Sequence, residues 1–174
     1  MKQLDKNEKI ETAALISMRL GCRTGNEKPK ILNDGTYLNE DLGFSSLIGV
    51  REWEKNSKED EGYDLYCKID NIGNSQLFDV KVNCKLGDRC IVRYNIESLR
   101  LNEEKIIVIP ISKVEFEIGV KNRKNLLVNT SFRNISGKCK YQILEVELYD
   151  DKEVVGVVSK GAFYEKAITN PERC

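Results

Sequence analysis

Apolar and polar residues alternate with a period of two over most of the chain from Tyr63 onward, and this is the period of half-buried β-strands. The clearest run is 78–84, where apolar side chains at even positions alternate with charged or amide side chains at odd positions. Further candidate strands cover 64–71, 90–94, 106–111, 126–133, 140–148 and 153–158, and of these 106–111 is apolar on both faces. Roughly seven or eight short strands without alternating helices predict a mainly β protein, an antiparallel β-sandwich.

Turn signals separate these runs. Gly87-Asp88 predicts a two-residue hairpin, Ser136-Gly137 predicts a turn before 140–148, and Asp34-Gly35 predicts a smaller hairpin near the N-terminus. Pro110 cannot donate a backbone hydrogen bond, so it predicts a sheet edge or the end of the strand at 106–111.

The phase of the strands also predicts the core. Apolar residues on the inner face of each strand are expected to be buried, and they are Ile69, Phe78, Val80, Val82, Val108, Val128, Leu144, Val146 and Leu148.

The first 62 residues have a different pattern. Asp5 and Glu8 have the spacing of a helix N-cap and its acidic partner, and Gly21 is suited to end a helix, so a helix is predicted at about 6–20. Residues 44–53 are a candidate first strand. We therefore divide the chain into an N-terminal helix and polar extension, residues 1–62, and a sandwich domain, residues 63–174.

The extension holds the predicted partner-binding residues, which are Ile10, Ala14, Met18 and Trp53. The first three would line one face of the helix, and tryptophan is a frequent anchor at interfaces. The alternative is that the helix covers an edge or apolar face of its own sandwich and that Trp53 packs in the core.

Charge and hydropathy bound the partners. The chain of 174 residues has 28 basic and 28 acidic side chains, with no basic stripe, so no nucleic-acid partner is expected. No apolar run approaches the ~20 residues of a membrane span. The N-terminus is too charged for a signal peptide, so the cytoplasm is the expected location.

The chain contains no histidine, which excludes histidine-dependent nucleophile pairs and metal sites. Its six cysteines are expected to be free thiols in the cytoplasm, and no pair has Cys-x-x-Cys spacing. Cys67 and Cys84 lie on predicted core faces, where cysteine acts as a small hydrophobe. A cysteine-based metal or redox sensor is the alternative.

Carboxylates are the other candidate chemistry. Glu103 and Glu104 are adjacent, and Glu145 and Glu147 alternate along one strand, a pattern typical of a solvated face. No catalytic group and no cofactor is predicted, and a carboxylate-dependent enzyme is kept as an alternative.

With these turns in view, the chain resembles an immunoglobulin-like β-sandwich of the bacterial cell-adhesion-related type, over about residues 63–150. It also resembles the sandwich attached to transmembrane helices in small bacterial proteins, although it has no such helices here. The residues that carry the resemblance are Asn71-Ile-Gly73, Leu77–Val82, Leu99–Glu104 and Val128–Gly137. The resemblance implies a fold and no catalytic residues. We therefore expect a non-enzymatic protein-interaction or scaffolding module of bacterial or phage type that binds a protein partner or a second copy of itself.

Overall fold

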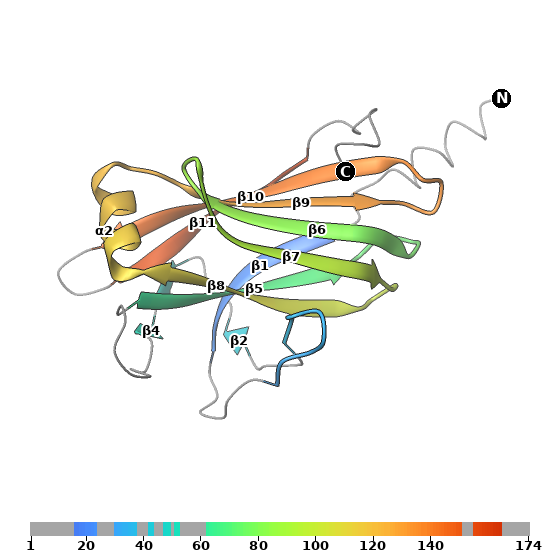
Figure 1. The fold of residues 1–174 in the computed structure, drawn as a ribbon, viewed down its shortest axis with the longest axis horizontal. Helices are drawn as coiled ribbons and strands as arrows, with labels where there is room; N and C mark the ends of the chain where they lie inside the picture. The colour runs from blue at the N-terminus through green and yellow to red at the C-terminus, as the bar shows by residue number, and fades with distance from the viewer. Residues whose placement is uncertain are drawn as a thin grey trace.

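The computed structural model describes residues 16–23, 30–37, 42–43, 47–49, 51–52, 62–150 and 155–164. Across these residues the strands form two antiparallel sheets, one of five strands and one of six, stacked as the two layers of a β-sandwich (Figure 1). The prediction of a mainly β antiparallel sandwich is confirmed.

The five-stranded sheet is built around one central strand. This strand, β5, pairs with β8 on one side and with β1 and β4 on the other, and β2 extends β1. The bounds are β1 Ile16–Arg23, β2 Leu42–Gly43, β4 Arg51–Glu52, β5 Gly62–Asn71 and β8 Glu104–Ser112.

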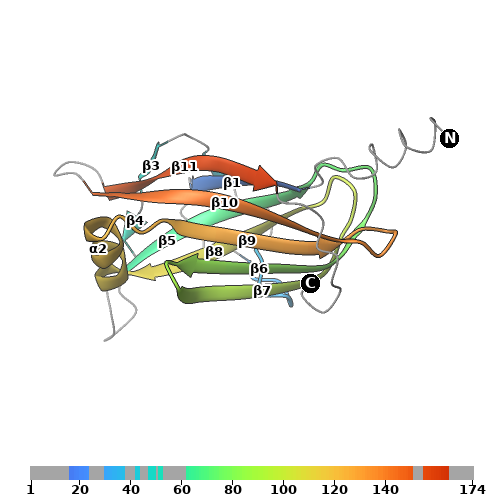
Figure 2. The ribbon, with the colours of Figure 1, turned by 90° about the horizontal axis from the view of Figure 1, so that it is seen from above.

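The six-stranded sheet has the order β3-β11-β10-β9-β6-β7, so β7 forms one of its margins (Figure 2). The predicted hairpin at Gly87-Asp88 joins β6 to β7, and Gly87 takes the positive φ that this turn requires. The bounds are β3 Leu47–Gly49, β6 Leu77–Leu86, β7 Arg89–Leu99, β9 Leu126–Arg133, β10 Cys139–Asp150 and β11 Val155–Tyr164.

A short helix, α2 (Lys113–Lys121), lies between β8 and β9 at one end of the sandwich (Figure 1). It begins with a capping box: the Ser112 hydroxyl accepts from Glu115 N at 3.2 Å, and the Glu115 carboxylate accepts from Ser112 N at 3.1 Å. Gly119 is buried, and a Cβ there would lie 2.6 Å from Leu148 Cδ1, so glycine allows the helix to approach β10 closely.

The core lies between the two sheets, and seven of the nine predicted core residues are buried in it. Val108 is also buried, but in a separate small cluster with Tyr66 and Ile106, so the predicted phase of β8 is wrong: Ile107 and Ile109 face the main core instead.

Phe78 is the one predicted core residue that is not buried, because it is 38% exposed. The register between β6 and β9 shifts between Phe78 and Lys81, and Asp79 has a φ of 49°, so β6 contains a bulge there. Leu77 and Val80 are both buried on either side of the bulge, which turns Phe78 outward.

The N-terminal helix is corrected where the structure describes it. Residues 16–20 belong to β1, whose Ile16 pairs with Asn71 and whose Met18 pairs with Ile69 of β5. Apolar Ile16, Met18 and Leu20 alternate with polar residues, so the period is two and not that of a helix. Residues 6–15 lie outside the described residues. Part of the predicted extension is therefore a strand of the sandwich.

Candidate functional site

Three loops gather at the end of the sandwich opposite α2, and we call them the loop end (Figures 1 and 2). They are residues 72–76 between β5 and β6, 100–103 between β7 and β8, and 134–138 between β9 and β10. The register places them together, because Asp70 pairs with Glu104, Leu77 with Leu99 and Phe78 with Arg133.

Each loop exposes one large aliphatic side chain. Ile72 is 57% exposed, Leu101 is 49% exposed and Ile135 is 69% exposed. Single exposed aliphatic residues are common on protein surfaces, but three at the tips of three neighbouring loops are a feature of binding surfaces.

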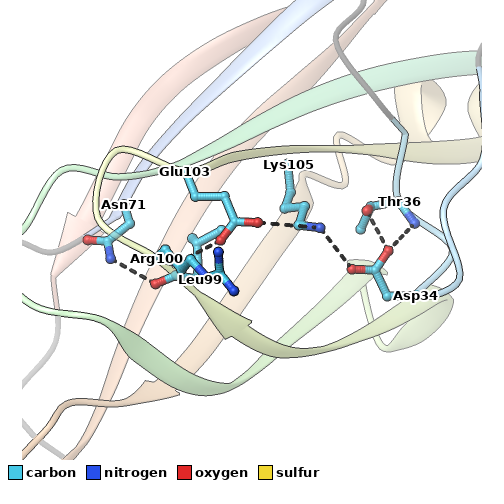
Figure 3. Close-up of polar contacts among 7 residues, drawn as sticks. All are labelled: Asp34, Thr36, Asn71, Leu99, Arg100, Glu103 and Lys105. Carbon is cyan, nitrogen blue, oxygen red and sulfur yellow. Dashed lines mark hydrogen bonds and ion pairs between the residues drawn. The ribbon is translucent and has the colours of Figure 1, made fainter.

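Asn71 fixes the first loop and joins it to the second (Figure 3). Its side chain is fully buried, and its Nδ2 donates to Leu99 O and to Ser75 O, both at 2.9 Å. Its Oδ1 accepts from Gly73 N at 3.0 Å. Its backbone N donates to Glu103 O, and its backbone O accepts from Asn102 N, both at 3.1 Å. One buried amide thus holds both Ile72 and Leu101 in place.

A chain of charged groups extends this support to the segment 30–37 (Figure 3). The Glu103 carboxylate accepts from Arg100 N at 2.7 Å and lies 3.6 Å from Lys105 Nζ, which is 3.3 Å from the Asp34 carboxylate. Burial raises the pKa of Asp34, but hydrogen bonds from Thr36 and the Lys105 ammonium outweigh it and leave that pKa below its ordinary value. Asp34 therefore stays charged near neutral pH and ties its predicted turn to β8.

Asn134 builds the third loop in the same way. It is 4% exposed, and its Oδ1 accepts from Lys138 N at 2.9 Å and from Ser136 Oγ at 2.7 Å. Gly137 N donates to Asn134 O at 2.9 Å, and Gly137, in the predicted turn, has a positive φ of 77°. Ile135 follows the buried asparagine directly, as Ile72 follows Asn71. Two buried asparagines thus each hold an exposed isoleucine on a hydrogen-bonded turn.

Of the four partner-binding residues predicted from the sequence, the structure describes only Met18. Met18 is buried at 6% exposure, where its sulfur accepts from Thr130 Oγ1 at 3.2 Å. Ile10, Ala14 and Trp53 lie outside the described residues, so their role stays a prediction.

The four cysteines whose side chains the structure describes divide into two groups. Cys67, Cys84 and Cys90 are free, as predicted, and Cys67 and Cys84 are fully buried on the core faces. Burial raises the pKa of Cys67 to about 12 and raises that of Cys84 as well, so both are protonated thiols and poor nucleophiles near neutral pH. Cys139 is disulfide-bonded, so the prediction of a free thiol is wrong there.

The carboxylates predicted as candidates are engaged in local contacts. Glu104 forms an ion pair with Lys68 and lies opposite Asp70 across β5 and β8. Burial raises the pKa of Asp70, Lys68 opposes the shift and Glu104 adds to it. Glu145 accepts a hydrogen bond from the Asn125 amide. Within the described residues, no three acidic or cysteine side chains gather so that they could hold a metal ion.

The comparisons with protein-family models, curated proteins and solved structures found no match for this chain. The part of the chain that the structure describes has no helix long and apolar enough to cross a membrane.

Proposed function

We propose that this chain is a non-enzymatic protein-interaction module of bacterial or phage type, and that the loop end is its binding surface. The partner is a protein with an apolar patch of matching extent. The immunoglobulin-like, adhesion-related type of sandwich is part of this proposal, and it is supported by the two stacked antiparallel sheets.

The observation that supports this proposal best is the pairing of rigid loops with exposed aliphatic tips. Ordering a flexible loop costs conformational entropy when it binds, and a loop already held by a buried amide avoids much of that cost. Burying Ile72, Leu101 and Ile135 against a partner would contribute roughly 1 kcal/mol or more for each side chain. Loops carried by a rigid sandwich are a common place for binding residues.

A pair of exposed apolar side chains on α2 is the alternative candidate for the binding surface. Val114 and Ile118 of α2 are 63% and 47% exposed, and their spacing of four residues places them on one helix face. This pair has two side chains rather than three, and the charged residues Lys113, Glu117 and Lys121 share the same short helix. We therefore place the partner at the loop end and use α2 as its control.

Replacing the three loop tips should abolish partner binding without unfolding the domain. In a variant with Ile72, Leu101 and Ile135 all changed to Asn, we expect the melting temperature to stay within a few degrees of the parent, since the replaced side chains are exposed. Proteins from the source organism that co-purify with the parent should not co-purify with this variant, because its affinity for the partner should fall by about 100-fold or more.

The matched control changes Val114 and Ile118 to Asn, which removes equally exposed aliphatic side chains at the opposite end. This variant should retain the same co-purifying proteins. Loss of the partner from the α2 variant but not from the loop variant would move the binding surface to α2.

Cys139 is disulfide-bonded, and disulfides persist mainly in oxidising compartments, which argues against the cytoplasmic location that the sequence predicts.

A further inference from the structure

β7 and β8 face each other across one open side of the sandwich. Their outer edges differ in whether the outward-facing backbone groups are hydrogen-bonded. On β8, Ile106 O accepts from Tyr37 N at 2.8 Å. Val108 N donates to Tyr94 Oη at 3.2 Å, and Val108 O accepts from that hydroxyl at 2.6 Å. Pro110 has no N–H at all. Three alternate residues of β8 are thus blocked for pairing with another strand at its outer edge: two already have backbone hydrogen bonds there, and the third has no N–H.

Tyr94 can serve both backbone groups because its hydroxyl keeps its proton. Burial raises the pKa of Tyr94 to about 12, so the group donates and accepts at neutral pH. The tyrosine belongs to β7, and its side chain therefore closes the edge of the opposite sheet.

The outer edge of β7 has no such closure by any residue that the structure describes. Among the described residues, β7 pairs only with β6, and the one further hydrogen bond to its backbone along residues 90–98 is donated by Cys90 Sγ to Val92 O at 4.0 Å. An edge strand directs every second N–H and C=O away from its sheet, and an eleven-residue strand with a free edge is a template for another strand. Figure 2 shows β7 along the margin of its sheet.

The exposed face of β7 is complementary to itself. Arg93, Asn95 and Glu97 alternate along it and all three are exposed. Within the described residues, Arg93 Nε donates only to the Cys90 sulfur, and the Glu97 carboxylate makes no hydrogen bond or ion pair.

We propose that β7 pairs with β7 of a second copy of this chain, antiparallel about a two-fold axis at Asn95. In this register Arg93 of each copy lies directly opposite Glu97 of the other, so two ion pairs flank the axis. On the inner face, Tyr94 lies opposite Ile96. Cross-strand pairs of opposite charge and aromatic–aliphatic pairs both stabilise antiparallel strands.

Neighbouring two-fold registers are less favourable. An axis at Arg93 would place the two Arg93 side chains opposite each other, and an axis at Glu97 would do the same with the two carboxylates. Like charges directly opposite each other are destabilising. An axis at Tyr94 or at Ile96 would place Asn95 opposite Arg93 or Glu97, without an ion pair at these positions. Of these five axes, only the one at Asn95 places Arg93 opposite Glu97.

The dimer would join the two six-stranded sheets into one continuous sheet. Because the β7 strands are antiparallel, the two loop ends would point in opposite directions, and the dimer could hold two partners apart. The inference goes beyond the loop-end proposal and is independent of it, since residues 93–97 lie in the middle of β7 and not in the loops.

Charge reversal with rescue tests this dimer. Sedimentation equilibrium of the full chain over a concentration series should show a monomer–dimer equilibrium. Arg93→Glu or Glu97→Arg alone should weaken the dimer about tenfold or more, because each places like charges opposite each other twice. The double variant should restore the parent dissociation constant, and Glu117→Arg, an exposed reversal on α2, should leave it unchanged.

A parent chain that stays monomeric over the whole series would overturn the proposal. It would also be overturned if the single reversals dimerise as well as the parent or if the double variant is no better than either one. Loss of partner binding in the loop variant has no bearing on these outcomes, so the two proposals fail separately.

Discussion

Val82→Asp should unfold the domain. Val82 is fully buried in the middle of β6, between β7 and β9, and the cluster around it includes residues from both sheets. An aspartate there would place a carboxylate in the core with no cation to pair with, at a cost of more than about 4 kcal/mol. This is a large part of the total stability of a small domain. Thermal unfolding followed by circular dichroism should show no cooperative transition for the variant.

Phe78→Asp is the matched control, four residues earlier on the same strand and with the same parity. Simple alternation along β6 would make both substitutions equally damaging. The bulge at Asp79 turns Phe78 outward, next to Arg133, so its replacement should cost only about 1 kcal/mol. If Phe78→Asp also fails to fold, or if Val82→Asp melts like the parent, the phase of β6 described here is wrong.

Asn71→Ala should have the second largest effect, a loss of about 2–4 kcal/mol. The change removes two donated hydrogen bonds and one accepted one, and it leaves Leu99 O without its buried donor. The free energy of unfolding in urea measures the loss. Because this amide holds the Ile72 and Leu101 loops together, the variant should also bind the partner less well at a temperature where it is still folded.

Asn74→Ala is the control for this prediction, because Asn74 is an exposed asparagine in the same loop. Its free energy of unfolding should stay within about 0.5 kcal/mol of the parent value. Equal stability of Asn71→Ala and Asn74→Ala would show that the buried amide does not organise the loop end.

Much of the sandwich could be predicted from the sequence because strand periodicity and turn residues are local signals. The hairpin at Gly87-Asp88 and the alternation along 140–148 both depend on neighbours within a few residues. The bulge that exposes Phe78 is not local in this sense, since it arises from the register between β6 and β9. At 16–20 the sequence predicts a helix where the structure has a strand, because the capping signal at Asp5 and Glu8 competes with the alternation of Ile16, Met18 and Leu20.

Signals for two further features were present in the sequence. Ser112 and Glu115 have the spacing of the capping box that begins α2. The helix has only nine residues and lies between strand-like runs, so its own periodicity is too short to predict it. The loop residues Ile72, Leu101 and Ile135 all lie in turns that carried the family resemblance. Their gathering at one end could not be predicted, because it requires the order of strands in both sheets. Local sequence identifies a turn and not which other turns lie beside it.

Site-specific photo-cross-linking tests the central claim, that the loop end binds the partner, most directly. A benzophenone amino acid would replace Ile135 in one variant and Ile118 of α2 in another, and each would be irradiated in cells of the source organism. The account predicts a discrete adduct from position 135, its disappearance when Ile72 and Leu101 are changed to Asn, and no such adduct from position 118. An adduct from position 118 with none from position 135 would contradict it.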